Sequence, residues 1–178
     1  ETIGEDATSN SAVFSRQFVK ETIIDSDLEL LIPDDYVNSL TERLVLYREL
    51  DNIVNEEDLV KYEENLRDRF GPVPIQAIEL INLVRMRWRA MKIGFEKMTL
   101  KNGKMLSYFV SNKNSDYFAS ENFKTVLAYV QKYPSLCTLK EQNNKLLLTI
   151  EDVTSINRAD EILKSITALL EENEQLAK

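Results

Sequence analysis

The sequence predicts an α+β fold in which an N-terminal helical hairpin and a long core helix pack with a small, largely antiparallel sheet and further helices. One observation is the order of patterns: after an extended start, helical periodicity precedes two short strand hairpins with a helix between them. A second is composition. Of the 178 residues 43% are apolar and 29% are charged, which is typical of a globular chain and excludes disorder throughout.

The N-terminal part divides into a tail and the start of the domain. Residues 1–17 are polar and lack periodicity, so we interpret them as a flexible tail or linker and residues 18–178 as a single domain. Residues 18–32 alternate at Leu28, Leu30 and Ile32, which predicts an extended segment, with a strand interrupted near residues 25–27. The chain does not begin with Met, and we expect it to be a piece of a longer protein.

Two helices are predicted next, and they form the hairpin. The first ends near residue 52 and begins at one of several capping residues, Asp34, Asp35 or Asn38-Ser39. Its predicted apolar face contains Leu40, Leu44, Tyr47 and Leu50 or Asp51. The second begins after Asn55, which can cap it, and its apolar positions are Leu59, Tyr62, Leu66 and Phe70.

Residues 68–94 contain a turn and a helix onto which we expect the rest of the domain to pack. Gly71, Pro72 and Pro74 end the preceding helix, and Pro74 suits the first turn of the next one. We expect this helix to be the longest in the protein and apolar over a wide arc, so that it is covered on more than one side. Its main apolar face contains Ala77, Ile81, Val84, Trp88 and Met91.

The second half of the chain predicts two strand hairpins. Asn102-Gly103 separates residues 97–101 from residues 104–111 and predicts a type I′ turn, which requires positive φ at both positions. A helix capped by Ser120 and ended by Pro134 follows, and residues 136–139 and 145–150 form the second hairpin around residues 141–144. A last helix is capped by Thr154 or Ser155, with an apolar side at Ile156, Ala159, Ile162, Leu163, Ile166 and Leu170.

Composition excludes most catalytic chemistry. The chain has no His, and its single cysteine, Cys137, is predicted to be a buried strand residue rather than part of a disulfide or metal site. No glycine-rich phosphate-binding loop occurs, and the acidic pairs fit solvated helix faces. We therefore expect no enzyme active site, no metal and no cofactor. No secretory segment or apolar run near the roughly 18 residues of a membrane helix is present, so we expect a cytoplasmic protein without a membrane partner.

Charge is segregated along the chain. Residues 21–71 contain 15 acidic and five basic residues, whereas residues 85–113 contain eight basic residues and one acid, Glu96. The net charge of −8 and the pI near 4.8 make direct DNA binding unfavourable, because phosphate binding needs clustered cations. Two interpretations stay open: internal pairing of the two regions, or a bipolar surface that docks a charged partner.

Three groups of residues, in this order and at these separations, resemble the C-terminal domain of the bacterial transcription-repair coupling factors (Mfd). They are Ile32-Pro33-Asp34-Asp35-Tyr36, then Arg43-Leu44 with Tyr47-Arg48, then Asp68-Arg69-Phe70-Gly71 with Pro74. The resemblance extends from about residue 18 to about residue 170. It implies that the chain is the noncatalytic, regulatory end of a long ATP-dependent DNA translocase. It further implies that the domain packs on a UvrB-like N-terminal module, masks UvrA binding and restrains the motor until RNA polymerase is engaged.

The resemblance also implies which residues make the docking contact. In the family, acids at the end of the helix before Arg-Phe-Gly face arginines and an aromatic residue of the UvrB-like module. Asp68 occupies the matching position, whereas Asn65 stands where the second acid is expected, with Glu64 beside it. We therefore expect Asp68, Glu64 and Asn65 to bind this partner. The alternative is that Asp68 pairs with Arg69 or Lys61, a surface interaction worth only about 0–1 kcal/mol.

A second function from a different class also stays open. The basic segment 85–104 predicts a nucleic-acid-binding accessory domain if Trp88 or Tyr108 stacks on bases beside free cations.

Overall fold

The computed structural model describes residues 17–178, so the predicted tail lies outside the described residues except for Gln17. The described part contains five α-helices, one short 3₁₀ helix and a five-stranded sheet, which confirms the α+β class. In chain order the elements are β1 (Ile23–Ser26), α1 (Leu40–Asp51), α2 (Glu56–Phe70), α3 (Ile75–Ile93), β2 (Phe95–Lys101), β3 (Lys104–Phe109), η1 (Asp116–Ala119), α4 (Glu121–Lys132), β4 (Cys137–Gln142), β5 (Lys145–Ile150) and α5 (Ile156–Leu176).

The sheet has the strand order β1-β2-β3-β5-β4. All pairs are antiparallel except β1 with β2, which are parallel, because α1, α2 and α3 carry the chain back between them. Asn102 and Gly103 have φ angles of 55° and 70°, which confirms the predicted hairpin turn. The second hairpin closes at Asn143-Asn144, so its loop has two residues rather than the four predicted.

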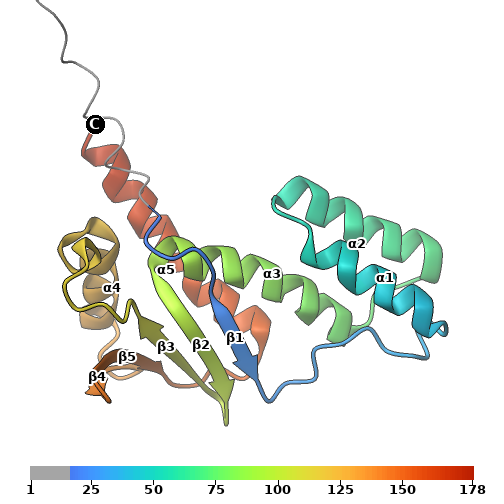
Figure 1. The fold of residues 1–178 in the computed structure, drawn as a ribbon, viewed down its shortest axis with the longest axis horizontal. Coiled ribbons are helices and arrows are strands. Elements are labelled where there is room, and N and C mark those ends of the chain that lie inside the picture. Colours follow the sequence, from blue (N-terminus) through green and yellow to red (C-terminus); the bar gives the residue numbers. More distant parts are fainter. Residues whose placement is uncertain (1–16) are drawn as a thin grey trace, which may run out of the picture.

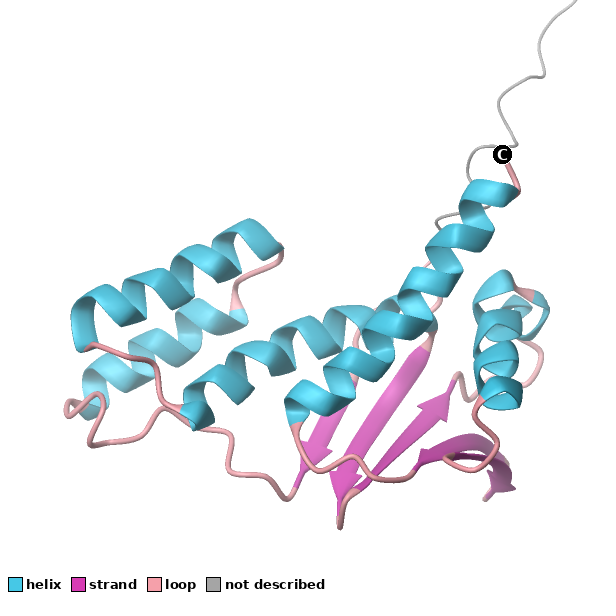
Figure 2. Cartoon of the chain, turned by 180° about the vertical axis from the view of Figure 1, so that it is seen from behind, coloured by secondary structure: helices cyan, strands magenta, loops and turns pink. Residues whose placement is uncertain are grey.

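Helices cover one face of the sheet. Figure 1 looks onto the other face, whereas in Figure 2 α3 and α5 lie in front of the strands. The inner side chains of the sheet are fully buried with α3, α4 and α5 in one cluster, which we call the sheet core; among them are Met98, Leu100, Met105, Leu148 and Ile150.

The helical hairpin has its own cluster, which we call the hairpin core and which includes Leu46, Leu59, Leu66, Ile81 and Val84. Ile81 and Val84 come from α3, whereas other residues of the same helix belong to the sheet core. Helix α3 is therefore covered on more than one side, as predicted. The hairpin lies along its N-terminal half and away from the sheet (Figure 1).

Two further expectations, on the length of α3 and on the inward face of α1, are corrected. Helix α5 has 21 residues and α3 has 19, so α3 is not the longest helix. Leu40 and Leu44 are 61% and 52% exposed, whereas Leu46 and Leu50 of the same helix are buried. Helix α1 has apolar residues on several of its sides, so periodicity alone does not predict which side faces inward.

Residues 112–119, predicted to be only a polar connection, contain η1 and the fully buried Tyr117. The hydroxyl of Tyr117 donates to the carbonyl of Ile93 at 2.9 Å, which holds this segment against the end of α3. A polar stretch therefore supplies one of the largest buried side chains of the sheet core.

Candidate docking surface on the helical hairpin

The motif residues converge around the end of α2. The hydroxyl of Tyr36 lies 3.0 Å from the carbonyl oxygen of Leu66 and 2.8 Å from that of Gly71. Its ring meets Phe70 edge to face at 5.7 Å. Burial raises the pKa of Tyr36, so the hydroxyl stays a donor. The segment before α1 is thus attached to the turn that ends α2.

The middle motif fixes α1 to the same segment. The Tyr47 hydroxyl accepts the backbone N–H of Ile32 at 2.7 Å, and the Arg43 guanidinium donates to the carbonyl of Val37 at 2.6 Å. Arg43 is drawn inward by this bond, which helps to explain why Leu40 and Leu44 face outward. Residues of all three motifs, Tyr36, Arg43, Tyr47 and Phe70, therefore fix the position of α2 relative to the rest of the hairpin.

Helix α2 begins as its sequence predicts. The Asn55 side chain accepts the N–H of Asp58 at 2.8 Å, and Glu56, Glu57 and Asp58 lie in the first turn, where the helix dipole favours acids. The buried residues are Leu59, Tyr62 and Leu66, with Phe70 half-buried. This inward face leaves the opposite side of the helix to solvent.

The predicted docking residues lie on that solvent side. Glu64, Asn65 and Asp68 are all exposed. Spacings of three and four residues bring them onto one strip of the last turns of α2. The side chains of Glu64 and Asp68 bind no other described residue. Asp68 also lies near the negative end of the helix dipole, where a carboxylate costs about 0.3–1 kcal/mol. Helix stability therefore does not explain this acid.

The alternative pairing of Asp68 is not found. Arg69 donates to Glu42 of α1 at 2.8 Å and lies 4.7 Å above the Phe70 ring. Lys61 pairs with Glu57 at 2.8 Å. Both neighbouring cations are therefore bound to other carboxylates, and Asp68 is available to an external cation.

The basic segment does not form one surface, and most of its cations are paired within the described chain. On α3, Arg85 donates to Glu56 at 2.7 Å, Arg89 to Asp160 at 2.8 Å and Lys92 to Glu171 at 2.7 Å. On the strands and the following loop, the pairs are Lys101 with Asp25, Lys104 with Glu151 and Lys113 with Glu141. Only Arg85 and Lys101 thus pair with acids of residues 21–71, whereas the other four cations pair with acids nearer the C-terminus.

The two aromatic residues proposed to stack on bases lie apart. Trp88 is half-buried against the hairpin core, whereas Tyr108 lies on β3 with Lys97 5.9 Å from its ring. They belong to different parts of the domain and do not form a joint platform. Stacking on bases, on which the nucleic-acid alternative is based, would therefore fall to Trp88 or to Tyr108 alone.

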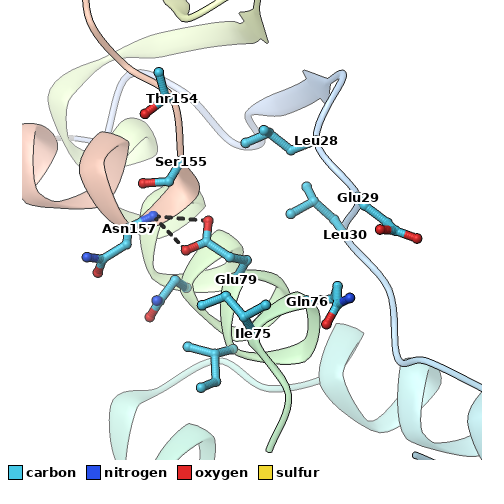
Figure 3. A pocket seen from close by; sticks show the side chains of 11 residues that line it. Leu28, Glu29, Leu30, Ile75, Gln76, Glu79, Thr154, Ser155 and Asn157 are labelled. Atoms are coloured by element: carbon cyan, nitrogen blue, oxygen red, sulfur yellow. Dashed lines mark hydrogen bonds between the residues drawn. The ribbon is translucent and has the colours of Figure 1, made fainter. Parts of the chain in front are cut away.

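A groove of about 580 Å³ separates the segment after β1 from the first turns of α3 and α5. Figure 3 shows Leu28, Leu30 and Ile75 along it and Glu79 at its floor. The Glu79 carboxylate accepts the backbone N–H groups of Ile156 and Asn157, so it caps α5. Glu29 points away from the groove (Figure 3). No free pair of acid and base groups remains here for catalysis.

Two observations on the described residues concern metal ligands and the single thiol. No group of three or more His, Cys, Asp or Glu side chains between residues 17 and 178 is suited to hold a metal ion. Cys137 is buried on β4, as predicted, and burial raises the pKa of its thiol. No helix in this region combines the length and apolar character needed to cross a membrane.

Sequence reasoning missed two residues that shape the predicted docking strip on α2. Glu42 holds Arg69 away from Asp68, and the exposed Val60 lies one turn before Glu64 on the same strip. The spacing 60, 64 and 68 was the available signal for Val60. The Glu42 contact crosses between two helices, and no local pattern indicates it.

Comparison with known proteins places these features in a family. A family model described as the TRCF domain matches residues 26–120. A transcription-repair-coupling factor of Rickettsia prowazekii is 27% identical over 148 residues, which cover 83% of this chain and 12% of the relative. That of Staphylococcus aureus is 24% identical over 161 residues, covering 89% and 13%. The chain thus spans about one eighth of the length of these curated relatives.

A solved structure shares the fold. The crystal structure of the C-terminal domain of a transcription-repair coupling factor superposes with a TM-score of 0.65 at 14% sequence identity. The match covers 85% of this chain and 95% of that one.

Proposed function

This chain belongs to the TRCF domain family, the C-terminal domain of transcription-repair coupling factors, and from this premise we propose that it is a noncatalytic autoinhibitory domain. In this proposal the domain docks on the UvrB-like N-terminal module of the parent translocase. Docking masks UvrA binding and restrains the motor until RNA polymerase is engaged. The contact is the strip formed by Glu64, Asn65 and Asp68 on α2.

The observation that carries the proposal is the unpaired state of Asp68. Its two neighbouring cations are bound to Glu42 and Glu57, and the carboxylate stands in solvent near the unfavourable end of the helix dipole. An arginine of a partner would neutralise this charge through a charge-assisted hydrogen bond. Glu64 adds a second carboxylate on the same strip, and Asn65 adds a neutral hydrogen-bonding group.

The test is Asp68→Arg in the full-length parent protein. The new arginine would face the arginine of the UvrB-like module and repel it. The closed state should therefore open, and UvrA capture in a pull-down should rise about tenfold. The matched control is Glu172→Arg, which makes the same charge change on an exposed position of α5 and should leave UvrA capture unchanged.

Two results would contradict the proposal. One is equal UvrA capture by wild-type and Asp68→Arg protein, and the other is an equal rise in the Glu172→Arg control. The helix dipole favours a cation near the C-terminal end of α2, so Asp68→Arg should not lower the melting temperature of the isolated domain. An unfolded domain therefore cannot account for the expected gain in UvrA binding.

A direct measurement of docking complements this test. The isolated domain, titrated with the UvrB-like module of its parent, should bind weakly, and binding should fall as salt rises. Weak affinity is sufficient because tethering within one chain raises the effective concentration into the mM range. The same titration with DNA should show no binding.

A further inference from the structure

The face of the sheet opposite α3 and α5 carries no described helix (Figures 1 and 2). Strand register places Lys97, Tyr108, Leu147 and Lys140 in one row across β2, β3, β5 and β4 on this face. Thr99, Leu106 and Thr149 form the next row. We call this surface the open sheet face. It is separate from the docking strip on α2.

The open sheet face is basic although the chain has a net charge of −8. Alternation along the strands brings five lysines to it: Lys97, Lys101, Lys104, Lys140 and Lys145. Lys101 pairs with Asp25 at 2.9 Å, and Lys104 pairs with Glu151 at 3.3 Å. The remaining three lysines bind no carboxylate among the described residues. The face therefore attracts acidic groups.

Apolar groups lie between these cations. Leu106 and Tyr108 are half-buried near the middle of the sheet, and Ile23 on the edge strand β1 is 63% exposed. An apolar centre with a charged rim is the usual composition of a protein interface. We propose that the open sheet face docks an acidic, amphipathic helix of a protein partner, with its leucine-like side chains on Leu106 and Tyr108 and its carboxylates on the lysines.

The observations favour a protein partner over single-stranded nucleic acid. Nonspecific nucleic-acid surfaces present several aromatic rings to successive bases, whereas this face has one ring, and Lys97 already lies over it. Asp25 and Glu151 would repel a continuous line of phosphates. A helix can instead place its few carboxylates beside the lysines and apolar side chains elsewhere.

The dimensions of the face suit one helix. Five strands about 4.8 Å apart give a width of roughly 19 Å, and six residues give a length of roughly 20 Å. A helix about 10 Å in diameter and about 14 residues long crosses this area. The partner segment is therefore short.

The test uses the 178-residue chain and a synthetic helical peptide as the probe. The peptide has about 14 residues, the length of helix that spans the face, with leucines on one side, glutamates beside them and a fluorescent label. We expect saturable binding by anisotropy and a loss of about tenfold in affinity for Lys97→Glu/Lys140→Glu. The matched control, Lys132→Glu/Lys164→Glu, should bind within about twofold of wild type.

Both double variants carry the same net charge, −8 − 4 = −12, and all four lysines are exposed; the melting temperature of each variant checks that it is folded. Equal losses in the two variants would reduce the effect to overall charge and overturn the proposal. No binding of the acidic peptide, or equal binding of the peptide with Gln in place of Glu, would also overturn it. Tighter binding of oligothymidylate that disappears in Lys97→Glu/Lys140→Glu would assign the face to nucleic acid instead.

Discussion

Gly94 ends α3 in a conformation that a side chain would block. Its φ is 110°, and a Cβ atom at this position would lie 2.2 Å from Cε2 of Tyr117. The ring cannot move aside easily, because it is fully buried and its hydroxyl is bonded to the carbonyl of Ile93. The close approach of helix end and ring depends on the absence of a side chain.

We therefore expect Gly94→Ala to lower the free energy of unfolding by about 3 kcal/mol or more. Gly103→Ala is the control, because it has a positive φ of 70° but only an ordinary contact at 3.6 Å with Thr154; it should cost about 1 kcal/mol. Urea unfolding of both variants measures the difference. Equal losses would mean that Tyr117 does not restrict this position.

At the residue scale, local chemistry was predictable from sequence and long-range contacts were not. Asn102-Gly103 specifies its turn by itself, and Ser39, Asn55, Ser120 and Ser155 each cap the helix that follows. The burial of Tyr117 depends on Gly94, which lies 23 residues earlier in the chain. Asp68 was identified only through a resemblance, and its exposed, unpaired state required the positions of Glu42 and Arg69.

Helices α3 and α5 are joined by an ion pair that is largely buried. Arg89 of α3 donates to Asp160 of α5 at 2.8 Å, and Asp160 is only 8% exposed. Removing the guanidinium would leave the Asp160 carboxylate without its ion-pair partner. The exposed pair of Lys104 with Glu151 offers a comparison in the same domain.

Arg89→Ala should destabilise the domain by about 2–3 kcal/mol, because one partner of a buried pair is lost. Lys104→Ala should change stability by no more than about 0.5 kcal/mol, because both partners remain hydrated. Denaturant unfolding at low and high salt separates the two cases. A loss below about 1 kcal/mol in Arg89→Ala would show that Asp160 is hydrated in the variant.

At the element scale, the buried face of a helix was predicted correctly where its apolar residues lie on one side. Helices α2 and α5 have one apolar side each, and their buried faces were predicted. Helix α1 has apolar residues on several sides, and its orientation is determined by Arg43 and Tyr47 bonding to the preceding segment. Those bonds connect residues that periodicity does not relate.

The two cores differ in size and share only α3. The sheet core joins all five strands to three helices, whereas the hairpin core is smaller and reaches the rest of the chain along one half of a single helix. The hairpin also leaves Leu40, Leu44 and Val45 exposed on α1. It should therefore open at a lower free energy than the sheet.

Hydrogen exchange measured by mass spectrometry tests this difference. Amides of α1 and α2 should exchange at least about tenfold faster than those of β3 and β5, because the hairpin opens as a unit while the sheet core stays closed. Equal protection of hairpin and sheet would mean that the domain opens only as a whole.

At the scale of the whole molecule, the sequence predicted the class but not the assembly. Alternation identified both strand hairpins, yet the parallel pairing of β1 with β2 joins residues more than 70 positions apart. The open sheet face also depends on this strand order, because its lysines come from four strands. For the same reason the cations of the basic segment, which are close in the sequence, are divided between α3 and the strands.

Helix α3 also determines the angle between the helical hairpin and the sheet. Arg85 and Arg89, one turn apart, hold Glu56 of the hairpin and Asp160 of α5. Because an α-helix turns about 100° and rises about 1.5 Å per residue, inserting a single residue between them would rotate the hairpin about the helix axis relative to the sheet. Asp68 would then point in a new direction relative to the sheet. The number of residues in α3, rather than any one contact, thus determines the direction in which Glu64, Asn65 and Asp68 of α2 face.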